Sequence, residues 1–431
     1  MKKTVLVNDP ILGPIDITSV LPIVDTPTFQ RLRFIKQMGI SYMIFTGATH
    51  SRFEHSIGAY QRTRDRMSVW RRDAIVTEQQ ARDIEIFGLL HDIGHGPLSH
   101  LIEPLCRENH GQRGQIILRQ LEKPIREAGG NFRNIRTLFR HENPLFGAVH
   151  DKNLGTEKFD YLERDAFHVG YGQRPGVANL TLFVSFKDGE LVIDPRAIDE
   201  AIQLQTFYLQ MYKNVYLRKG ASVLQRMFQR MISGLMDSGL REEQLWEMTD
   251  DDLMVEFRCS HKKWIRFYDE RFRCRDLAKT AISIKRNCFL EREVARGKKA
   301  MKVFGIDSEV MELLTRVYQS PQVIADTELK LAQIARLPSW SILLLPVADP
   351  SRFIPQNIKI LAKGGLDSLK EIRPDHFRAM EETAHSYTSI RIATFPEFRE
   401  KVAGAKVAEA LAGFLIESAG KIAKNHPLTA K

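Results

Sequence analysis

Apolar residues recur every three or four positions along most of this chain, which is the spacing of one face of an α-helix. Thr26, Pro27 and Gly39 have the residue types of a helix N-cap, a first helical position and a helix end, so they predict a helix between them. Thr77 and Gln80 match a capping box, and the apolar run behind them predicts a largely buried helix. The chain is therefore expected to be mainly α-helical.

Strand patterns are confined to two regions. The runs TLFVSF and ELVID lie within residues 179–194 and are joined through Asp188 and Gly189, which predicts a β-hairpin. Helical periodicity resumes after the hairpin and is expected to continue to about Leu331. Near the C-terminus the runs SILLLPV, NIKILA and SIRIATF match strands, and the last helical pattern covers residues 397–424.

These patterns predict three parts in a chain of 431 residues, which is long enough to bury a large core. Residues 1–240 are expected to form a helical core that includes the hairpin at 179–194. Residues 241–336 are expected to form a helical extension, and residues 337–431 a small α+β subdomain.

The formal charge of +10 favours anionic partners without selecting among them. Between residues 258 and 299 the basic residues alternate with acidic and apolar ones, as on a solvated helix face, so nucleic acid is not the favoured partner. The four cysteines are far apart and contain no C-x-x-C pair, which argues against a disulfide framework and against a thiolate zinc site.

Neither a membrane span nor a signal peptide is expected. No apolar run approaches the roughly 20 residues that cross a bilayer. The N-terminal residues MKKTVLVNDP contain too short an apolar stretch for a secretory signal. We therefore expect a cytoplasmic protein without membrane contact.

The segment FGLLHDIGHGPLSH, residues 87–100, carries the strongest chemical signal. Three histidines and an aspartate follow an apolar run, and imidazole with carboxylate is a common ligand set for a divalent metal ion. His91 and Asp92 can converge in the last turn of a helix, whereas lone histidines are more often helix caps or core residues. Pro97 is expected to begin a second helix that carries His100 and Glu103.

Two further segments offer functional side chains. GATHSRFEHSIGAY contains His55, which could turn toward the same ion as His91 and Asp92. TEKFDYLERDAFHVGYG is rich in acids, and Lys158 with Tyr161 could face a phosphate and a base or sugar. The alternative for this second segment is a solvated acidic helix.

Five blocks in the same order resemble the HD-domain deoxynucleoside triphosphate triphosphohydrolases, a family of metal-dependent phosphohydrolases. The blocks are NDPILGPID, DTPTFQRLRFIKQMG, TGATHSRFEHSIGAY, LLHDIGHGPLSH and EKFDYLERD. The likeness is strong over residues 8–171 and is only architectural beyond residue 337. It implies a mainly α fold with an HD-domain helical core, a small β-hairpin and a C-terminal α+β appendage.

The resemblance implies a role for particular residues of this chain. The metal ligands would be His55, His91, Asp92 and Glu157, and the ion could be Mn, Mg, Fe, Zn or Ni. The catalytic residues would be His95, His100, His110, Glu103 and Arg52, with Arg52 on a phosphate and Glu103 acting through His100. The substrate contacts would be Gln37 and Asp165 at the sugar 3′-hydroxyl, Lys158 at a phosphate, and Tyr161 and Tyr216 along the sugar.

The implied reaction is hydrolysis of a deoxynucleoside triphosphate to a deoxynucleoside and tripolyphosphate, which would control nucleotide pools or serve antiviral defence. The resemblance also implies a nucleotide effector bound by Asn8, Asp25, Gln30 and Arg33. A site of that kind implies a homo-oligomer, which could be a dimer, tetramer or hexamer.

Three positions depart from the family pattern. Glu157 stands where the family has an aspartate, and Asp151 and Asp160 are the next candidates for that ligand. Tyr208 stands near the place of an arginine that faces the terminal phosphates, and Val5 stands at an effector-binding lysine. Two alternatives therefore remain open, a phosphohydrolase acting on another nucleotide and a nucleotide-sensing or nucleic-acid-binding protein with little turnover.

Overall fold

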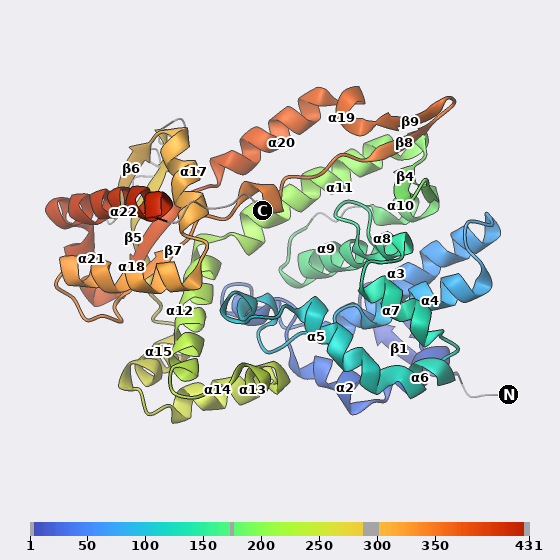
Figure 1. Cartoon of the computed structure of the whole chain (residues 1–431), viewed down its shortest axis with the longest axis horizontal. Helices are drawn as coiled ribbons and strands as arrows, with labels where there is room; N and C mark the ends of the chain where they lie inside the picture. The colour runs from blue at the N-terminus through green and yellow to red at the C-terminus, as the bar shows by residue number, and fades with distance from the viewer. Residues whose placement is uncertain (1–3, 173–175, 288–300, 426–431) are drawn as a thin grey trace. The chain divides into compact units, whose positions relative to one another are not determined.

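The computed structural model describes residues 4–172, 176–287 and 301–425 (Figure 1). The fold is mainly α-helical with a few small sheets, as the sequence predicts. The chain divides into two compact units, and each is built from segments that are distant in sequence. The three-part division into 1–240, 241–336 and 337–431 stays a prediction.

The first unit comprises Met1–Met211, Glu242–Leu253 and Pro355–Met380. Its helices are α1 (Leu21–Val24), α2 (Pro27–Gln30), α3 (Arg52–Arg72), α4 (Glu78–Leu90), α5 (His110–Ile117), α6 (Glu122–Glu127), α7 (Phe132–Phe139), α8 (Gly147–His150), α9 (Thr156–His168), α10 (Val177–Phe183), α11 (Ile198–Met211), α13 (Glu242–Glu247) and α19 (Leu369–Ile372). Helices α14 (Asp250–Cys259) and α20 (Pro374–Ser386) have residues in both units.

Helix α3 is the centre of the first unit and packs on both α4 and α9 (Figure 1). Ser51 and Glu54 form a capping box at the start of α3, and Thr77 and Gln80 form the predicted one at the start of α4. Gly58 lets α9 come close to α3, because a Cβ at this position would lie 2.0 Å from Asp160 Oδ1.

The predicted hairpin is present and belongs to a larger sheet. Strands β3 (Val184–Lys187) and β4 (Glu190–Ile193) pair antiparallel around Asp188 and Gly189, while the start of the TLFVSF run belongs to α10. Strand β4 also pairs in parallel with β8 (Lys359–Ala362), which pairs antiparallel with β9 (Gly365–Ser368). A separate hairpin joins β1 (Leu6–Asp9) and β2 (Gly13–Asp16).

The second unit comprises Tyr212–Arg241, Met254–Ile354 and Glu381–Lys431. Its sheet has the order β6 (Lys302–Ile306), β5 (Lys279–Arg286), β10 (Ile390–Thr394), β7 (Ile342–Leu345). Its helices are α12 (Lys219–Met236), α15 (Lys263–Arg273), α17 (Ser308–Val317), α18 (Pro321–Ile334), α21 (Pro396–Ala403) and α22 (Ala405–Asn425).

The strands β7, β8 and β10 match the three predicted runs, and α21 with α22 covers the predicted last helix. The prediction of helix up to Leu331 is wrong over β5 and β6. The sequence of β5 has basic residues at both ends of a short apolar stretch, a pattern that also fits a solvated helix face. Its pairing with β6 and β10 shows that it is a strand.

Three cysteines, Cys106, Cys259 and Cys274, are free thiols, and Cys288 lies outside the described residues. Among the helices that the structure describes, none combines the length and apolar character needed to cross a membrane.

The second unit contains a buried ion pair with a large expected effect on stability. Glu328, 1% exposed, accepts hydrogen bonds from Arg226 at 2.7 and 2.8 Å, from Arg230 at 3.0 Å and from Leu344 N at 2.8 Å. We expect Glu328→Ala to lower the free energy of unfolding by about 3–5 kcal/mol, because the guanidinium of Arg226 would be left buried without a counter-charge. Urea denaturation measures this loss. The exposed control Glu309→Ala should change stability by less than about 1 kcal/mol, and equal effects of the two substitutions would contradict the prediction.

Candidate active site

His55, His91 and Asp92 come together in the first unit, and we call them the HD site. His55 Nε2 lies 3.1 Å from His91 Nε2, and each of these nitrogens lies 3.5 Å from an oxygen of Asp92. All three residues are buried. The N-terminal part of α3 supplies His55, and the turn that follows α4 supplies the other two. The structure therefore confirms that the sequence pattern brings these side chains to one point.

The outward nitrogens of both imidazoles are held by hydrogen-bond acceptors. His55 Nδ1 lies 2.8 Å from Asp160 Oδ2, and His91 Nδ1 lies 2.8 Å from the carbonyl oxygen of Gly88. Each Nδ1 must carry the proton in these bonds, so in the neutral form of each ring Nε2 carries a lone pair. Two neutral rings would turn these lone pairs toward each other, with the nitrogens 3.1 Å apart, and a cation bound by both would stabilise that arrangement. This donor set fits a divalent metal ion, and the acceptors behind it fix the imidazole orientation.

The protonation states of the HD site also suit a cation. Burial lowers the pKa of His91 to about 4, so this imidazole is neutral at neutral pH. Burial alone would raise the pKa of Asp92, but Arg52 and the neighbouring histidines hold it well below its usual range. Arg52 Nη1 donates to Asp92 Oδ2, and Arg52 Nε donates to Ser99 Oγ at 2.9 Å. The site thus contains the carboxylate of Asp92 and the neutral imidazole of His91, the forms of these groups that bind metals.

Glu157, in the first turn of α9, lies beside the HD site. Its Oε2 is 3.5 Å from His91 Nε2 and accepts a hydrogen bond from His150 Nδ1 at 2.7 Å. Burial would raise the pKa of Glu157, but His150 lowers it to about 2, so the carboxylate is ionised. Glu157 is therefore placed to complete the ligand set, and His150 is a contact that the sequence analysis missed.

The two other acids considered as ligands are engaged elsewhere. Asp151 Oδ1 accepts hydrogen bonds from the backbone of Asn153 and Leu154 at 2.8 and 2.7 Å. Asp160 binds Arg164 and holds His55 Nδ1. Among the described acids, Glu157 is thus the best candidate for the fourth ligand.

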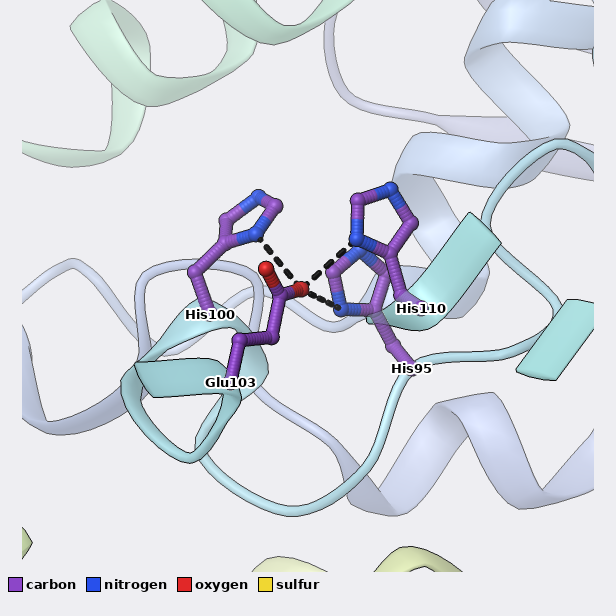
Figure 2. A group of neighbouring side chains, drawn as sticks. All are labelled: His95, His100, Glu103 and His110. Carbon is purple, nitrogen blue, oxygen red and sulfur yellow. Dashed lines mark hydrogen bonds and ion pairs between the residues drawn. The ribbon is translucent and has the colours of Figure 1, made fainter. Parts of the chain in front are cut away.

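A second group, the histidine cluster, consists of His95, His100, Glu103 and His110 (Figure 2). Figure 2 shows the three rings around one carboxylate oxygen. Glu103 Oε1 accepts from His100 Nδ1 at 3.0 Å and from His110 Nδ1 at 2.6 Å, and it lies 4.0 Å from His95 Nδ1. Burial would raise the pKa of Glu103, but the bonds from His100 and His110 hold it well below its usual range.

The histidine cluster is joined to the HD site through Asp92. His95 Nε2 lies 3.2 Å from Asp92 Oδ1, and the His95 ring stacks on His110 at 4.0 Å between centroids. Burial and the nearby Arg52 keep the pKa of His95 well below its usual range, so this ring is neutral. His100, with 63% of its side chain exposed, is the member most open to solvent. The structure thus brings all the predicted metal-ligating and catalytic residues into one neighbourhood.

The segment between His95 and His100 is held by contacts distant in sequence. Leu98 and Ser99 adopt φ angles of +58° and +59°, a region that non-glycine residues rarely occupy. Asp250 accepts from Leu98 N at 2.7 Å, and Gly39 lies so near that a Cβ would be 2.9 Å from Leu98 O. The predicted second helix from Pro97 is therefore absent. Two 3₁₀ turns, η4 (Ser99–Leu101) and η5 (Glu103–Leu105), take its place.

Comparison with known proteins agrees with this geometry. The sequence family described as the HD domain matches residues 52–165, and the one described as the HD associated region matches residues 178–413, more than half of the chain. This chain belongs to the HD-domain family with an HD associated region. The fold agrees, because a phosphohydrolase from Bacteroides thetaiotaomicron superposes with a TM-score of 0.68 at 21% identity, covering 91% of this chain and 99% of the other.

Two relatives of this HD-domain protein illustrate the extent of the sequence similarity. An uncharacterized protein of Methanocaldococcus jannaschii is 31% identical over 263 residues, which is 58% of this chain and 54% of the relative. A protein of Dictyostelium discoideum, named as a homolog of the deoxynucleoside triphosphate triphosphohydrolase SAMHD1, is 28% identical over 240 residues, or 51% and 47% of the two chains. The chain spans about half the length of these curated relatives.

The HD-domain chain places two predicted sugar contacts around His50, which the sequence analysis missed. His50 Nε2 lies 2.8 Å from Asp165 Oδ1, and the His50 carbonyl accepts from Gln37 N at 2.9 Å. Gln37 Oε1 is buried and has no hydrogen-bond partner among the described residues. An acceptor of this kind suits a ligand hydroxyl. His50 precedes Ser51 in the HSRFEH block, but its spacing gave no signal of a link to α9.

The predicted phosphate and sugar contacts of α9, Lys158 and Tyr161, have different neighbours. Tyr161 lies 6.4 Å from His55 between ring centroids, at the edge of the HD site. The Lys158 ammonium donates to the carbonyl oxygen of Lys152 and lies 3.2 Å from the centre of the Tyr208 ring, while burial lowers its pKa to about 7. Tyr216 belongs to the second unit, so its predicted role stays a prediction.

The predicted effector residues lie near the N-terminus of the HD-domain chain. Arg33 Nε donates to Gln30 Oε1 at 2.7 Å, and the Arg33 guanidinium lies 3.5 Å from the centre of the Phe53 ring. Asp25 is exposed after α1, and Asn8 lies in β1. Gln30 and Arg33 thus form a pair on the surface, and their effector role stays a prediction.

Proposed function

We propose that this protein is a metal-dependent phosphohydrolase that converts deoxynucleoside triphosphates to deoxynucleosides and tripolyphosphate. The observation that carries the proposal is the pair of imidazole Nε2 atoms of His55 and His91, 3.1 Å apart and flanked by the carboxylates of Asp92 and Glu157. His55, His91, Asp92 and Glu157 would hold the ion. A bound divalent ion polarises a phosphoryl oxygen and lowers the pKa of a water molecule.

The residues around the HD site supply the remaining chemistry. Arg52 holds its guanidinium against Asp92 and Ser99, where it can stabilise charge on the reacting phosphate. Water attacks the α-phosphorus, and the bond from that phosphorus to the 5′ oxygen breaks. Glu103 holds His100 at Nδ1, and in its protonated form His100 would give the Nε2 proton to the departing 5′ oxygen, while the attacking water gives up the proton that replaces it.

The deoxyribose of the substrate would bind beside His50. Asp165, oriented by His50, and the unpaired oxygen of Gln37 are suited to a sugar 3′-hydroxyl, and Tyr161 lies at the edge of the HD site. The name of the Dictyostelium relative supports this substrate class. We further propose an activating nucleotide at Asn8, Asp25, Gln30 and Arg33, bound in a homo-oligomer.

A phosphohydrolase that acts on another nucleotide is the second candidate. It is favoured by Lys158, which is the predicted phosphate contact but is engaged by Tyr208 and by the Lys152 carbonyl. Such an arrangement would weaken the requirement for a terminal phosphate, so mono-, di- and modified nucleotides become candidate substrates.

The substrate class is tested by incubating the metal-loaded protein with each deoxynucleotide and ribonucleotide at the mono-, di- and triphosphate level, singly and in mixtures. The proposal predicts turnover of deoxynucleoside triphosphates, with stimulation in mixtures if an effector acts. Turnover of monophosphates or diphosphates alone would favour the second candidate. Nucleotide binding without any turnover would contradict both and support a sensing protein.

His150 is expected to position Glu157 for metal binding. We predict that His150→Ala weakens metal affinity by about 10–100-fold, because the carboxylate loses the partner that fixes it. Competition with a chelating dye measures this affinity. His150→Asn retains a donor near Nδ1 and should restore most of this affinity, and the exposed His261→Ala is the control. Equal affinities in all four proteins would show that the pair has no part in metal binding.

A further inference from the structure

A cavity of about 240 Å³ lies in the first unit, away from the HD site. It is lined by α5, the turn η6 (Leu118–Leu121) that follows it, and α7, which Figure 1 shows beside each other. Arg119, Arg136 and Arg140 line it together with the amide side chains of Gln112 and Gln115. We call it the arginine cavity. Apart from Glu108, its polar lining consists of groups that can donate hydrogen bonds to an anion.

The positive charge of the arginine cavity is poorly neutralised by the protein. In the part of the chain that the structure describes, no carboxylate forms an ion pair with Arg119 or Arg136, and Arg140 has only Glu142 at 3.8 Å. Glu108, the one acid in the lining, lies 3.5 Å from Arg113. Three guanidinium groups therefore share one concavity, and only Arg140 has a carboxylate partner, an arrangement that a bound anion would stabilise.

Aromatic side chains lie between the cavity and His150, which borders the HD site. Phe139 lines the cavity and packs against Phe87 of α4 with 5.0 Å between ring centroids. Phe87 in turn lies 5.4 Å from the His150 ring. On the other side, α5 is packed so tightly that a Cβ at Gly94 would lie 2.0 Å from the His110 carbonyl oxygen. The basic side chains thus extend from closely packed helices that have aromatic rings behind them.

We propose that the arginine cavity binds a phosphate chain, either free polyphosphate or the triphosphate of a nucleotide. Guanidinium groups match phosphate oxygens in charge and in hydrogen-bond geometry. The volume admits a short phosphate chain, and several cations around it favour a ligand with several negative charges over a single carboxylate. The proposal rests on the cavity and its charge and does not depend on turnover at the HD site.

Calorimetric titration of the full-length chain with inorganic tripolyphosphate, in the presence of a chelator, tests this proposal. Binding should weaken at least 10-fold in the double variant Arg119→Gln with Arg136→Gln. The control Arg133→Gln lies on the exposed side of α7 outside the cavity lining and should bind within about twofold of the unmodified protein. Equal binding in all three proteins would overturn the proposal, since the anion would then bind elsewhere.

A second measurement needs no variant. Phenylglyoxal modifies exposed arginines, and tripolyphosphate should protect Arg119, Arg136 and Arg140 at least 5-fold more than Arg133, as read by mass spectrometry. Uniform protection would overturn the proposal. Parallel titrations with a deoxynucleoside triphosphate and a deoxynucleoside identify the source. Binding of tripolyphosphate or of the deoxynucleoside triphosphate supports a phosphate site, and the tighter of the two is the preferred ligand. Binding of the deoxynucleoside alone would contradict the proposal.

Discussion

Replacing His91 by alanine is expected to lower phosphohydrolase turnover by at least about 10³-fold. A metal ion contributes several kcal/mol to stabilising the transition state, and each 1.4 kcal/mol corresponds to about tenfold in rate. His91 Nε2 faces His55 Nε2 at 3.1 Å and lies 3.5 Å from oxygens of Asp92 and Glu157, so its loss opens the centre of the ligand set. Turnover and bound metal, measured on the same preparation, check this.

The control for this prediction is His261→Ala, which removes an exposed histidine of the second unit. It should leave turnover and metal content within about twofold of the unmodified protein. Circular dichroism and the melting temperature establish that both variants are folded. A folded His91→Ala protein that retains metal and turnover would show that the ion, if any, is bound elsewhere.

Replacing Glu103 by glutamine is expected to lower turnover by about 10²–10⁴-fold while leaving metal content unchanged. The carboxylate accepts hydrogen bonds from His100 and His110, and proton transfer by a positioned side chain has this magnitude. Glutamine keeps the size but loses the charge that orients the rings. Single-turnover rates and metal content separate the two effects. The surface control Glu122→Gln should match the unmodified protein.

Two outcomes would contradict the role of Glu103. Unchanged turnover would show that the histidine cluster takes no part in proton transfer. Loss of metal together with turnover would mean that the histidine cluster itself contributes to metal binding, which its composition permits.

The HD site could be predicted from the sequence because short sequence signals mark the helix ends that carry its residues. Thr77 and Gln80 define the start of α4, so the position of His91 and Asp92 at its end follows from a helix of ordinary length. His55 could be added because small residues around it allow α3 to pack closely. The fourth ligand remained open between three acids, and only the contacts of Asp151 and Asp160 favour Glu157.

Contacts between distant segments could not be predicted in this way. His150 lies seven residues before Glu157 on a different helix, so periodicity gives no indication that they meet. The segment after His95 is shaped by Asp250 and Gly39, which is why a helix predicted from Pro97 is replaced by tight turns. The pairing of β4 with β8 joins segments more than 160 residues apart for the same reason.

Hydrolysis of a deoxynucleoside triphosphate in water enriched in oxygen-18 tests the central claim most directly. Attack at the α-phosphorus with loss of the 5′ oxygen places the heavy oxygen in tripolyphosphate. Mass spectrometry should therefore find labelled tripolyphosphate and an equal amount of unlabelled deoxynucleoside, both dependent on added metal. Label in orthophosphate, in a deoxynucleoside monophosphate or in the deoxynucleoside would show that another bond is cleaved and would contradict the proposed reaction.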